Sequence, residues 1–269
     1  MFNLENSTIP ISNYQLLFTV VLILITGAVS SLLKLGLFKS LIWGTIRTFV
    51  QLTLVGYALT YIFAINKLWL IIIIITLMCF IASRAAIKRT PNVPNYPTVL
   101  AFLSLFASTY LVGSIVTTLI IAPDPWYSAR IAIPIFGMIL GNSMNGIAIS
   151  LDRLYNEART RSAEIEAMLT FGATPWEAIQ PSVREAIRAG MTPTINSLMV
   201  VGLVSLPGMM TGQILGGADP REAVRYQIVV QLMIAAAVAI GCLILVGLSY
   251  KKLFNKDDAL QSFVLQSRR

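Results

Sequence analysis

The sequence predicts an all-α integral membrane protein with about seven transmembrane helices. Only 12% of its 269 residues are charged and 56% are hydrophobic, whereas soluble domains average about 25% charged residues. The mean hydropathy is +0.76. A hydrocarbon core about 30 Å thick requires roughly 20 apolar residues per helix, and the chain contains repeated runs of about this length.

Seven apolar runs account for the predicted spans. They cover residues 12–33, 41–65, 67–83, 96–121, 130–149, 192–216 and 224–249. The first run lacks the preceding positive charges of a signal peptide, so we expect it to be retained as a span. With seven spans, 15 of the 20 Lys and Arg residues fall on one face of the membrane. By the positive-inside rule this face is cytoplasmic, which places the N-terminus outside and the C-terminus in the cytoplasm.

A charged helical insert, expected on the cytoplasmic side at residues 150–190, interrupts the apolar runs. Residues 150–171 have apolar side chains at spacings of three and four, which predicts one amphipathic helix. Gly172 suits a left-handed helix end. Thr174, Pro175 and Glu177 then match a capping box with proline at the first helical position, so a second helix is expected there. We expect Pro181 to kink or restart this helix and Gly190 to end it.

Part of the insert resembles a known loop. The segment "EAMLTFGATPW" is similar to the EAA loop of ABC-transporter permeases, with Met168 replacing the usual third residue. In that superfamily the loop forms a coupling helix that docks on the ATPase subunit. The resemblance implies the following ATPase-coupling residues: Glu166, Ala167, Gly172, Ala173, Thr174, Pro175, Trp176 and Glu177.

Three further stretches extend the resemblance. The segments "IPIFGMILGNSMNG" (133–146), "TPTINSLMVVGLVSLPGMMTGQILGGADP" (192–220) and "YQIVVQ" (226–231) resemble the FetB family. These proteins are permease subunits of iron-export ABC systems, and plant aluminium-tolerance membrane proteins are related to them. The resemblance covers roughly residues 40–250. The tail 251–269 lies outside this resemblance.

The resemblance implies a permease subunit without enzymatic activity of its own. No glycine in the chain is followed by lysine, so a P-loop is absent and the chain itself needs no cofactor. ATP and Mg would be bound by a separate cytoplasmic ABC ATPase subunit. The expected assembly is a homodimer of this chain with two ATPases in a lipid bilayer, and nucleic acid is not an expected partner. Residues 1–269 would form a single permease domain in the cell membrane, the inner membrane of a bacterium.

Polar and sulfur-containing side chains inside the spans form a candidate translocation path, because polar groups in a bilayer are costly. Asn142 and Asn145 lie three residues apart and either line the path or bond a neighbouring helix. Gly137 and Gly141 predict close helix packing. Pro207 predicts a broken or kinked sixth span. The candidate path residues are Arg47, Gln51, Asn142, Asn145, Asn196, Met199, Pro207, Gly208, Met209, Met210 and Gln213.

The residues do not independently support iron as the cargo. The chain has no histidine, and no carboxylate falls inside a predicted span. Methionine thioethers prefer soft metals. The alternatives are therefore an ABC permease for another metal or a small organic solute, or an ATP-independent secondary carrier. An assembly factor that uses the insert for docking also remains open, whereas an intramembrane hydrolase is disfavoured because histidine is absent.

Overall fold

The structure is a computed structural model that describes residues 11–90, 93 and 97–261. Nearly all of the described residues are helical, and none of them belongs to a named β-strand. The α-helices are α1 (Asn13–Leu32), α2 (Phe38–Ile65), α3 (Leu68–Lys88), α4 (Thr98–Ile115), α5 (Ala129–Thr160), α6 (Ser162–Thr170), α7 (Pro175–Val200), α8 (Gly208–Leu215) and α9 (Pro220–Ser249). A π-helix, η1 (Val116–Ile120), extends α4, and a 3-10 turn, η2 (Tyr250–Leu253), follows α9. Most of the proline-interrupted link at 89–97 and residues 262–269 of the tail lie outside the described residues.

Six of the described helices are long and apolar enough to cross a membrane: α1, α2, α3, α4 with η1, α5, and α9 with η2. The expected span at 192–216 is not one helix. Helix α7 ends at Val200, and α8 begins only at Gly208. Helix α7 ends because Val201 takes an extended conformation (φ −62°, ψ 132°) and Gly202 a φ of 83°. Pro207, which has no N–H to donate, directly precedes α8. The predicted break at Pro207 is confirmed.

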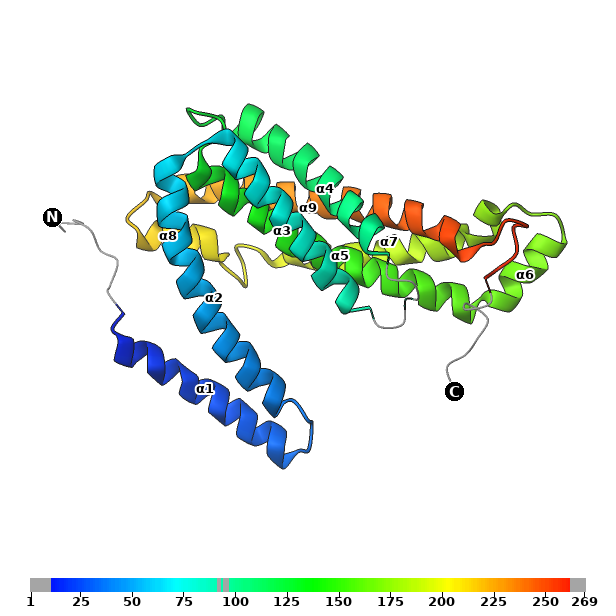
Figure 1. Ribbon diagram of the computed structural model, residues 1–269, viewed down its shortest axis with the longest axis horizontal. Coiled ribbons are helices and arrows are strands. Elements are labelled where there is room, and N and C mark those ends of the chain that lie inside the picture. The colour runs from blue at the N-terminus through cyan, green and yellow to red at the C-terminus, as the bar shows by residue number, and fades with distance from the viewer. Residues whose placement is uncertain (1–10, 91–92, 94–96, 262–269) are drawn as a thin grey trace. The chain divides into compact units, whose positions relative to one another are not determined.

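The chain divides into two compact units. One contains the residues up to Asn66 with Gln213–Ala218, and the other contains Lys67–Gly212 with the residues from Asp219 onward. In the first unit α1 packs on α2, where Phe38 lies against Gly27. The second unit is a bundle in which α5 packs against α3, α4, α7 and α9 (Figure 1). The candidate sites described below belong to this second unit.

Hydrogen bonds and small side chains join the helices of the bundle. Ser104 of α4 donates to the carbonyl of Gly241 in α9 at 2.6 Å. The hydroxyls of Thr76 in α3 and Tyr110 in α4 lie 2.9 Å apart. Within a bilayer, where lipid tails are as apolar as leucine, such bonds and close backbone packing drive helix association.

Helices α5 and α7 approach closely at Gly146 and Gly190. A Cβ atom on Gly190 would lie 1.9 Å from Oγ of Ser150 and 2.7 Å from the carbonyl oxygen of Gly146. A Cβ on Gly141 would meet nothing within 4 Å. The expectation that Gly190 ends a helix is therefore wrong, because this glycine lies inside α7 and allows it to touch α5. The expected close packing at Gly141 is also not observed.

The helices of the insert begin and end at other residues than the sequence predicted. Helix α5 continues from the apolar region to Thr160 without a break, and only Ser162–Thr170 forms a separate helix. The expected single helix at 150–171 is thus the end of α5 followed by α6. Helix α7 also runs unbroken through Pro181 and Pro193. Each proline removes a single hydrogen bond, and the burial of Ala178, Ile179 and Val183 holds this helix in place.

The Gly146–Gly190 contact generates a stability prediction. Gly190→Ala should destabilise the protein by about 1–3 kcal/mol, because the new methyl group overlaps Ser150 and the Gly146 carbonyl. Gly141→Ala is the matched control in α5, and it should be neutral or stabilising by about 0.5–1 kcal/mol, since alanine favours helix and the space is open. Thermal unfolding in detergent measures both variants. Equal melting temperatures would contradict the contact.

Candidate functional site

A polar cavity of about 350 Å³ opens among α5, α7, α9 and the break that precedes α8. None of its lining residues carries a formal charge, although several bear amides or hydroxyls. The lining residues are Met138, Asn142, Asn145, Gly146, Gly190, Pro193, Thr194, Ser197, Ser205, Pro207, Gly208, Met209, Gln227, Val230, Gln231 and Ile234. The cavity therefore presents neutral hydrogen-bonding groups inside an otherwise apolar bundle.

A chain of amide hydrogen bonds forms the α9 wall of the cavity. Gln227 donates to Oε1 of Gln231 at 3.4 Å, and Gln231 donates to Oγ of Ser197 at 2.8 Å. Gln227 is 6% exposed, and its Oε1 accepts no hydrogen bond from the described residues. An unpaired buried acceptor costs about 1–3 kcal/mol, and this oxygen is covered by neighbouring atoms rather than open to the cavity. Sequence reasoning missed Gln227 and Gln231 as site residues, although both lie in the "YQIVVQ" segment.

The α5 wall of the cavity carries Asn142 and Asn145, two of the candidate path residues. Asn142 donates to the Met138 carbonyl of its own helix at 2.9 Å. Asn145 accepts a hydrogen bond from the guanidinium of Arg89, the residue that ends α3. Arg89 thus places a positive charge beside a residue of the uncharged lining. The positive charge of Arg89 repels a bare metal cation, so a metal would enter the cavity more easily together with ligands that reduce its charge.

Two neighbouring methionines, Met209 and Met210, lie in the first turn of α8. Met209 lines the polar cavity together with Pro207 and Gly208. Met210 instead lines an apolar pocket of about 310 Å³ between α7, α9 and the break. Two adjacent residues with the same side chain therefore face different surroundings.

The structure brings together only part of the predicted path. Asn196 and Met199 are exposed on α7 and do not line the cavity. Arg47, Gln51 and Gln213 belong to the first unit and are not among the lining residues. Of the candidates, Asn142, Asn145, Pro207, Gly208 and Met209 meet at the cavity.

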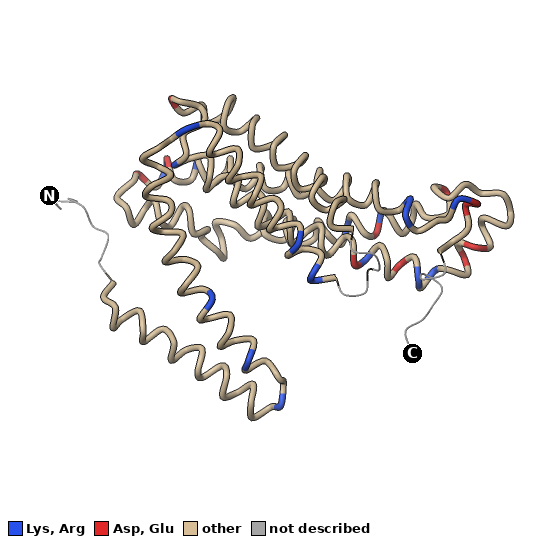
Figure 2. The backbone as a smooth tube through the Cα atoms, in the orientation of Figure 1, with Lys and Arg blue, Asp and Glu red and all other residues tan. Residues whose placement is uncertain are grey.

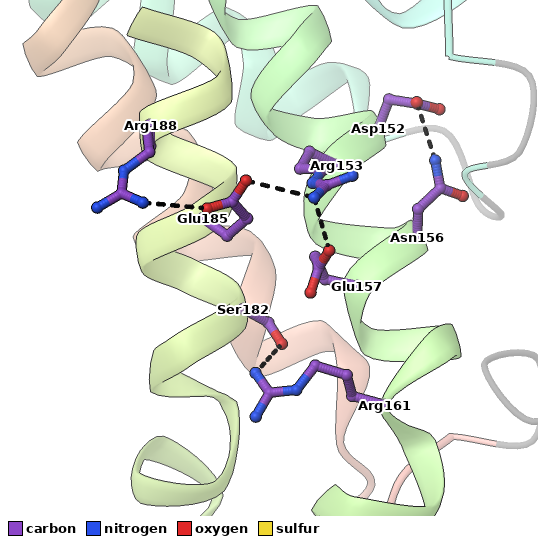
Figure 3. Close-up of polar contacts among 8 residues, drawn as sticks. All are labelled: Asp152, Arg153, Asn156, Glu157, Arg161, Ser182, Glu185 and Arg188. Carbon is purple, nitrogen blue, oxygen red and sulfur yellow. Dashed lines mark hydrogen bonds and ion pairs between the residues drawn. The ribbon is translucent and has the colours of Figure 1, made fainter. Parts of the chain in front are cut away.

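The far ends of α5 and α7 are joined by ion pairs and hydrogen bonds (Figure 3). Arg153 contacts Glu157 at 3.0 Å and Glu185 of α7 at 3.3 Å. Arg161 donates to Oγ of buried Ser182 at 3.3 Å. Exposed ion pairs contribute at most about 1 kcal/mol each. Their main effect is to set the register of α5 against α7, above the buried side chains of Leu151, Leu154 and Ala158.

The turn between α6 and α7 has the predicted geometry. Gly172 takes a φ of 92°, in the positive-φ region that glycine adopts more readily than other residues. Oγ1 of Thr174 accepts from the Glu177 N–H at 3.3 Å, and Glu177 accepts from the Thr174 N–H at 2.8 Å. These two bonds form the predicted capping box. The backbone N–H and then the hydroxyl of Thr174 hold the pKa of the Glu177 carboxyl below its ordinary value.

This end of the bundle, made of α6 and the adjoining ends of α5 and α7, is called the tip. Charged residues gather there (Figure 2). The side chain of Phe171 is 90% exposed, and Trp176 is 42% exposed. Glu166, Ala167 and Gly172 are also exposed. The tip therefore combines an exposed aromatic side chain, mixed charges and a rigid turn, which suits contact with another protein better than contact with lipid.

No group of three or more Cys, Asp or Glu side chains that could hold a metal ion occurs in the described part of the chain, and the sequence contains no histidine. The two cysteines, Cys79 and Cys242, are buried and unpaired. The polar cavity offers metal ions only amide, hydroxyl, carbonyl and thioether donors. These groups are weak ligands for iron when no carboxylate or imidazole accompanies them.

The helices and the cavity define a multi-pass helical membrane protein. The chain belongs to the uncharacterised protein family UPF0014, whose model matches residues 13–254. The expected FetB resemblance is confirmed. An Escherichia coli (strain K12) protein named probable iron export permease protein FetB is 35% identical over 251 residues, which cover 93% of this chain and 95% of the relative.

Two further relatives are similar over nearly the whole chain. The Bacillus subtilis UPF0014 membrane protein YjkA is 39% identical over 247 residues, 90% of this chain and 96% of its own length. The Arabidopsis thaliana protein ALUMINUM SENSITIVE 3 is 33% identical over 247 residues, 92% of this chain and 89% of its own length. No solved structure matches the chain.

The cavity predicts a specific pattern of thiol accessibility. The chain should not react with a membrane-impermeant maleimide, because Cys79 and Cys242 are both 0% exposed. Asn142→Cys should react at least about tenfold faster, because only a thiol in contact with water forms the reactive thiolate. Ile73→Cys is the control, since Ile73 is 55% exposed on apolar α3 and should face lipid. Equal labelling of the two variants would show that the cavity is not open to water.

Proposed function

We propose that this chain is the membrane-spanning permease subunit of an ABC transporter, which exports iron from the cytoplasm with ATP hydrolysed by a separate subunit. One observation carries the proposal. Helices α5 and α7 both line the polar cavity, and both continue unbroken to the tip. A permease requires such a continuous connection, because ATP hydrolysis occurs outside the membrane and must alter a site within it.

The tip is the proposed docking site of the ATPase. The Gly172 turn, the capping box and exposed Phe171 support this assignment, together with the likeness of 166–177 to an EAA loop. Residues 150–190 would lie in the cytoplasm, consistent with the positive-inside distribution of Lys and Arg. Two ATP sites require two permease halves, so the proposed assembly is a homodimer of this chain with two ATPases. The whole chain would act as one permease domain.

The polar cavity is the proposed cargo site. Its neutral lining and the nearby Arg89 do not suit a bare iron ion. Iron would therefore pass with weak contacts to carbonyls, amides and Met209, or with ligands that it carries itself. The relative named as a probable iron export permease supports iron as the metal. An organic solute is the second candidate cargo, and the neutral amides and hydroxyls of the lining favour it because they can hydrogen-bond to such a solute.

The docking proposal is tested at the turn. Gly172→Val should abolish co-purification of the ATPase, because a β-branched residue at a φ of 92° costs about 1–3 kcal/mol and shifts α6 relative to α7. Gly172→Asn is the matched control, since asparagine tolerates positive φ, and it should retain the ATPase. Both variants should still insert in the membrane. Undiminished ATPase capture by Gly172→Val would refute docking at the tip.

The cargo proposal is tested with the two methionines. In liposomes containing the chain and its ATPase, iron should stimulate ATP hydrolysis and cross the membrane. Met209→Ala should lower iron flux several-fold while basal hydrolysis is kept, because a thioether that lines the cavity is lost. Met210→Ala, which changes the apolar pocket instead, should transport iron normally.

Two results would contradict the cargo proposal. If Met209→Ala and Met210→Ala lowered flux equally, the cavity would not be the metal path. If hydrolysis were independent of metal and an organic solute crossed instead, the iron assignment would be wrong while the permease assignment would stand.

A further inference from the structure

The segment that follows α9 is folded. Leu253 is 0% exposed, and Phe254 and Leu260 are nearly as buried. Residues 254 and 260 form an antiparallel bridge, with Asn255 N–H donating to the Ala259 carbonyl at 2.8 Å and Gln261 N–H donating to the Leu253 carbonyl at 2.9 Å. We call residues 250–261 the tail hairpin.

The turn of the tail hairpin has a defined conformation. Oδ1 of Asn255 accepts hydrogen bonds from the N–H groups of Asp257 at 2.8 Å and Ala259 at 3.0 Å. Asp258 takes a φ of 58°, a conformation that Asp and Asn tolerate better than most residues. Both Asp257 and Asp258 are exposed. Two carboxylates are thus held outward on an ordered turn, which lowers the entropy lost when a partner binds them.

The tail hairpin lies beside the turn of the tip. The rings of Trp176 and Tyr250 have centroids 5.2 Å apart. A groove of about 630 Å³ lies between the two segments. Its lining residues are Glu166, Leu169, Thr170, Gly172, Ala173, Thr174 and Pro175 from the tip, and Asp257, Asp258, Ala259 and Leu260 from the tail hairpin.

The charge of this groove indicates the chemistry of its partner. All of its charged lining residues, Glu166, Asp257 and Asp258, are acidic, although the whole chain has a net charge of +8. None of the three forms an ion pair among the described residues. The lysines of the tail hairpin, Lys251, Lys252 and Lys256, do not line the groove. Carboxylates repel anionic lipid headgroups, so the groove suits a basic protein surface.

We propose that the tail hairpin is the second wall of the ATPase-docking surface, and that the ATPase subunit inserts a Lys- or Arg-bearing segment into the groove. This inference rests on the proposed docking of an ATPase at the tip. Exposed Phe171 adds an apolar anchor on the adjoining turn, the kind of side chain that dominates binding at interfaces. The carboxylates of Glu166, Asp257 and Asp258 then confer specificity and salt dependence.

The experiment measures the affinity of the purified ATPase subunit for the full chain in nanodiscs at low and high salt. Asp257→Lys combined with Asp258→Lys should weaken binding at low salt by about tenfold or more, because charges at an interface rim are felt most at low ionic strength. The milder pair Asp257→Asn and Asp258→Asn should weaken it less and reduce the salt dependence. Asparagine tolerates the positive φ at position 258, so this variant keeps the turn intact.

The control applies the same charge change away from the groove. Asp124→Lys combined with Glu222→Lys alters residues that precede α5 and begin α9, and it should leave the affinity unchanged. The inference is overturned if the Asp257 and Asp258 variants bind like the unaltered chain, or if the control weakens binding equally. The proposed function fails separately, if the unaltered chain itself does not bind the ATPase.

Discussion

The structure of the second unit depends on the direct backbone contact of α5 and α7 at Gly146 and Gly190. The small Ser150 side chain of α5 lies against Gly190, and Val238 and Cys242 of α9 close the contact from a third side. Gly146 and Gly190 also line the polar cavity. Toward the tip the two helices are joined by the Arg153–Glu185 ion pair and the Arg161–Ser182 hydrogen bond. One close approach thus underlies both the cavity and the tip.

The cavity balances two physical demands. Buried polar groups require partners, and two hydrogen bonds link Gln227, Gln231 and Ser197. A binding site must also present accessible polar groups, and the exposed amides of Asn142 and Asn145 in the lining meet this condition. Because no formal charge lines the cavity, release of the cargo does not require a strong ion pair to break. Such a lining suits a site that must bind and release cargo in every transport cycle.

Local signals in the sequence predicted much of the fold and part of the site. The capping box at Thr174 and the break at Pro207 depend on neighbouring residues alone, so their chemistry could be recognised directly. Pro181 and Gly190 are also residue types that commonly end a helix, but tertiary packing keeps α7 helical through both positions. The turn at Arg161 has no glycine or proline to mark it. Gln227 and Gln231 could not be assigned because their partner Ser197 is 34 residues distant from Gln231, and only the fold joins them.

The position of Gly146 within α5 has a mechanical consequence. At a rise of 1.5 Å per residue, Asn142 lies about 6 Å along the helix from this contact, and Thr160 lies about 21 Å away on the other side. A rigid rod that rocks about the contact has arms of unequal length. If α5 rocked in this way, a displacement at the tip would reach Asn142 reversed in direction and reduced about three- to fourfold, with the force multiplied by the same ratio. Small, forceful movements of this kind suit the widening of a close-packed cavity.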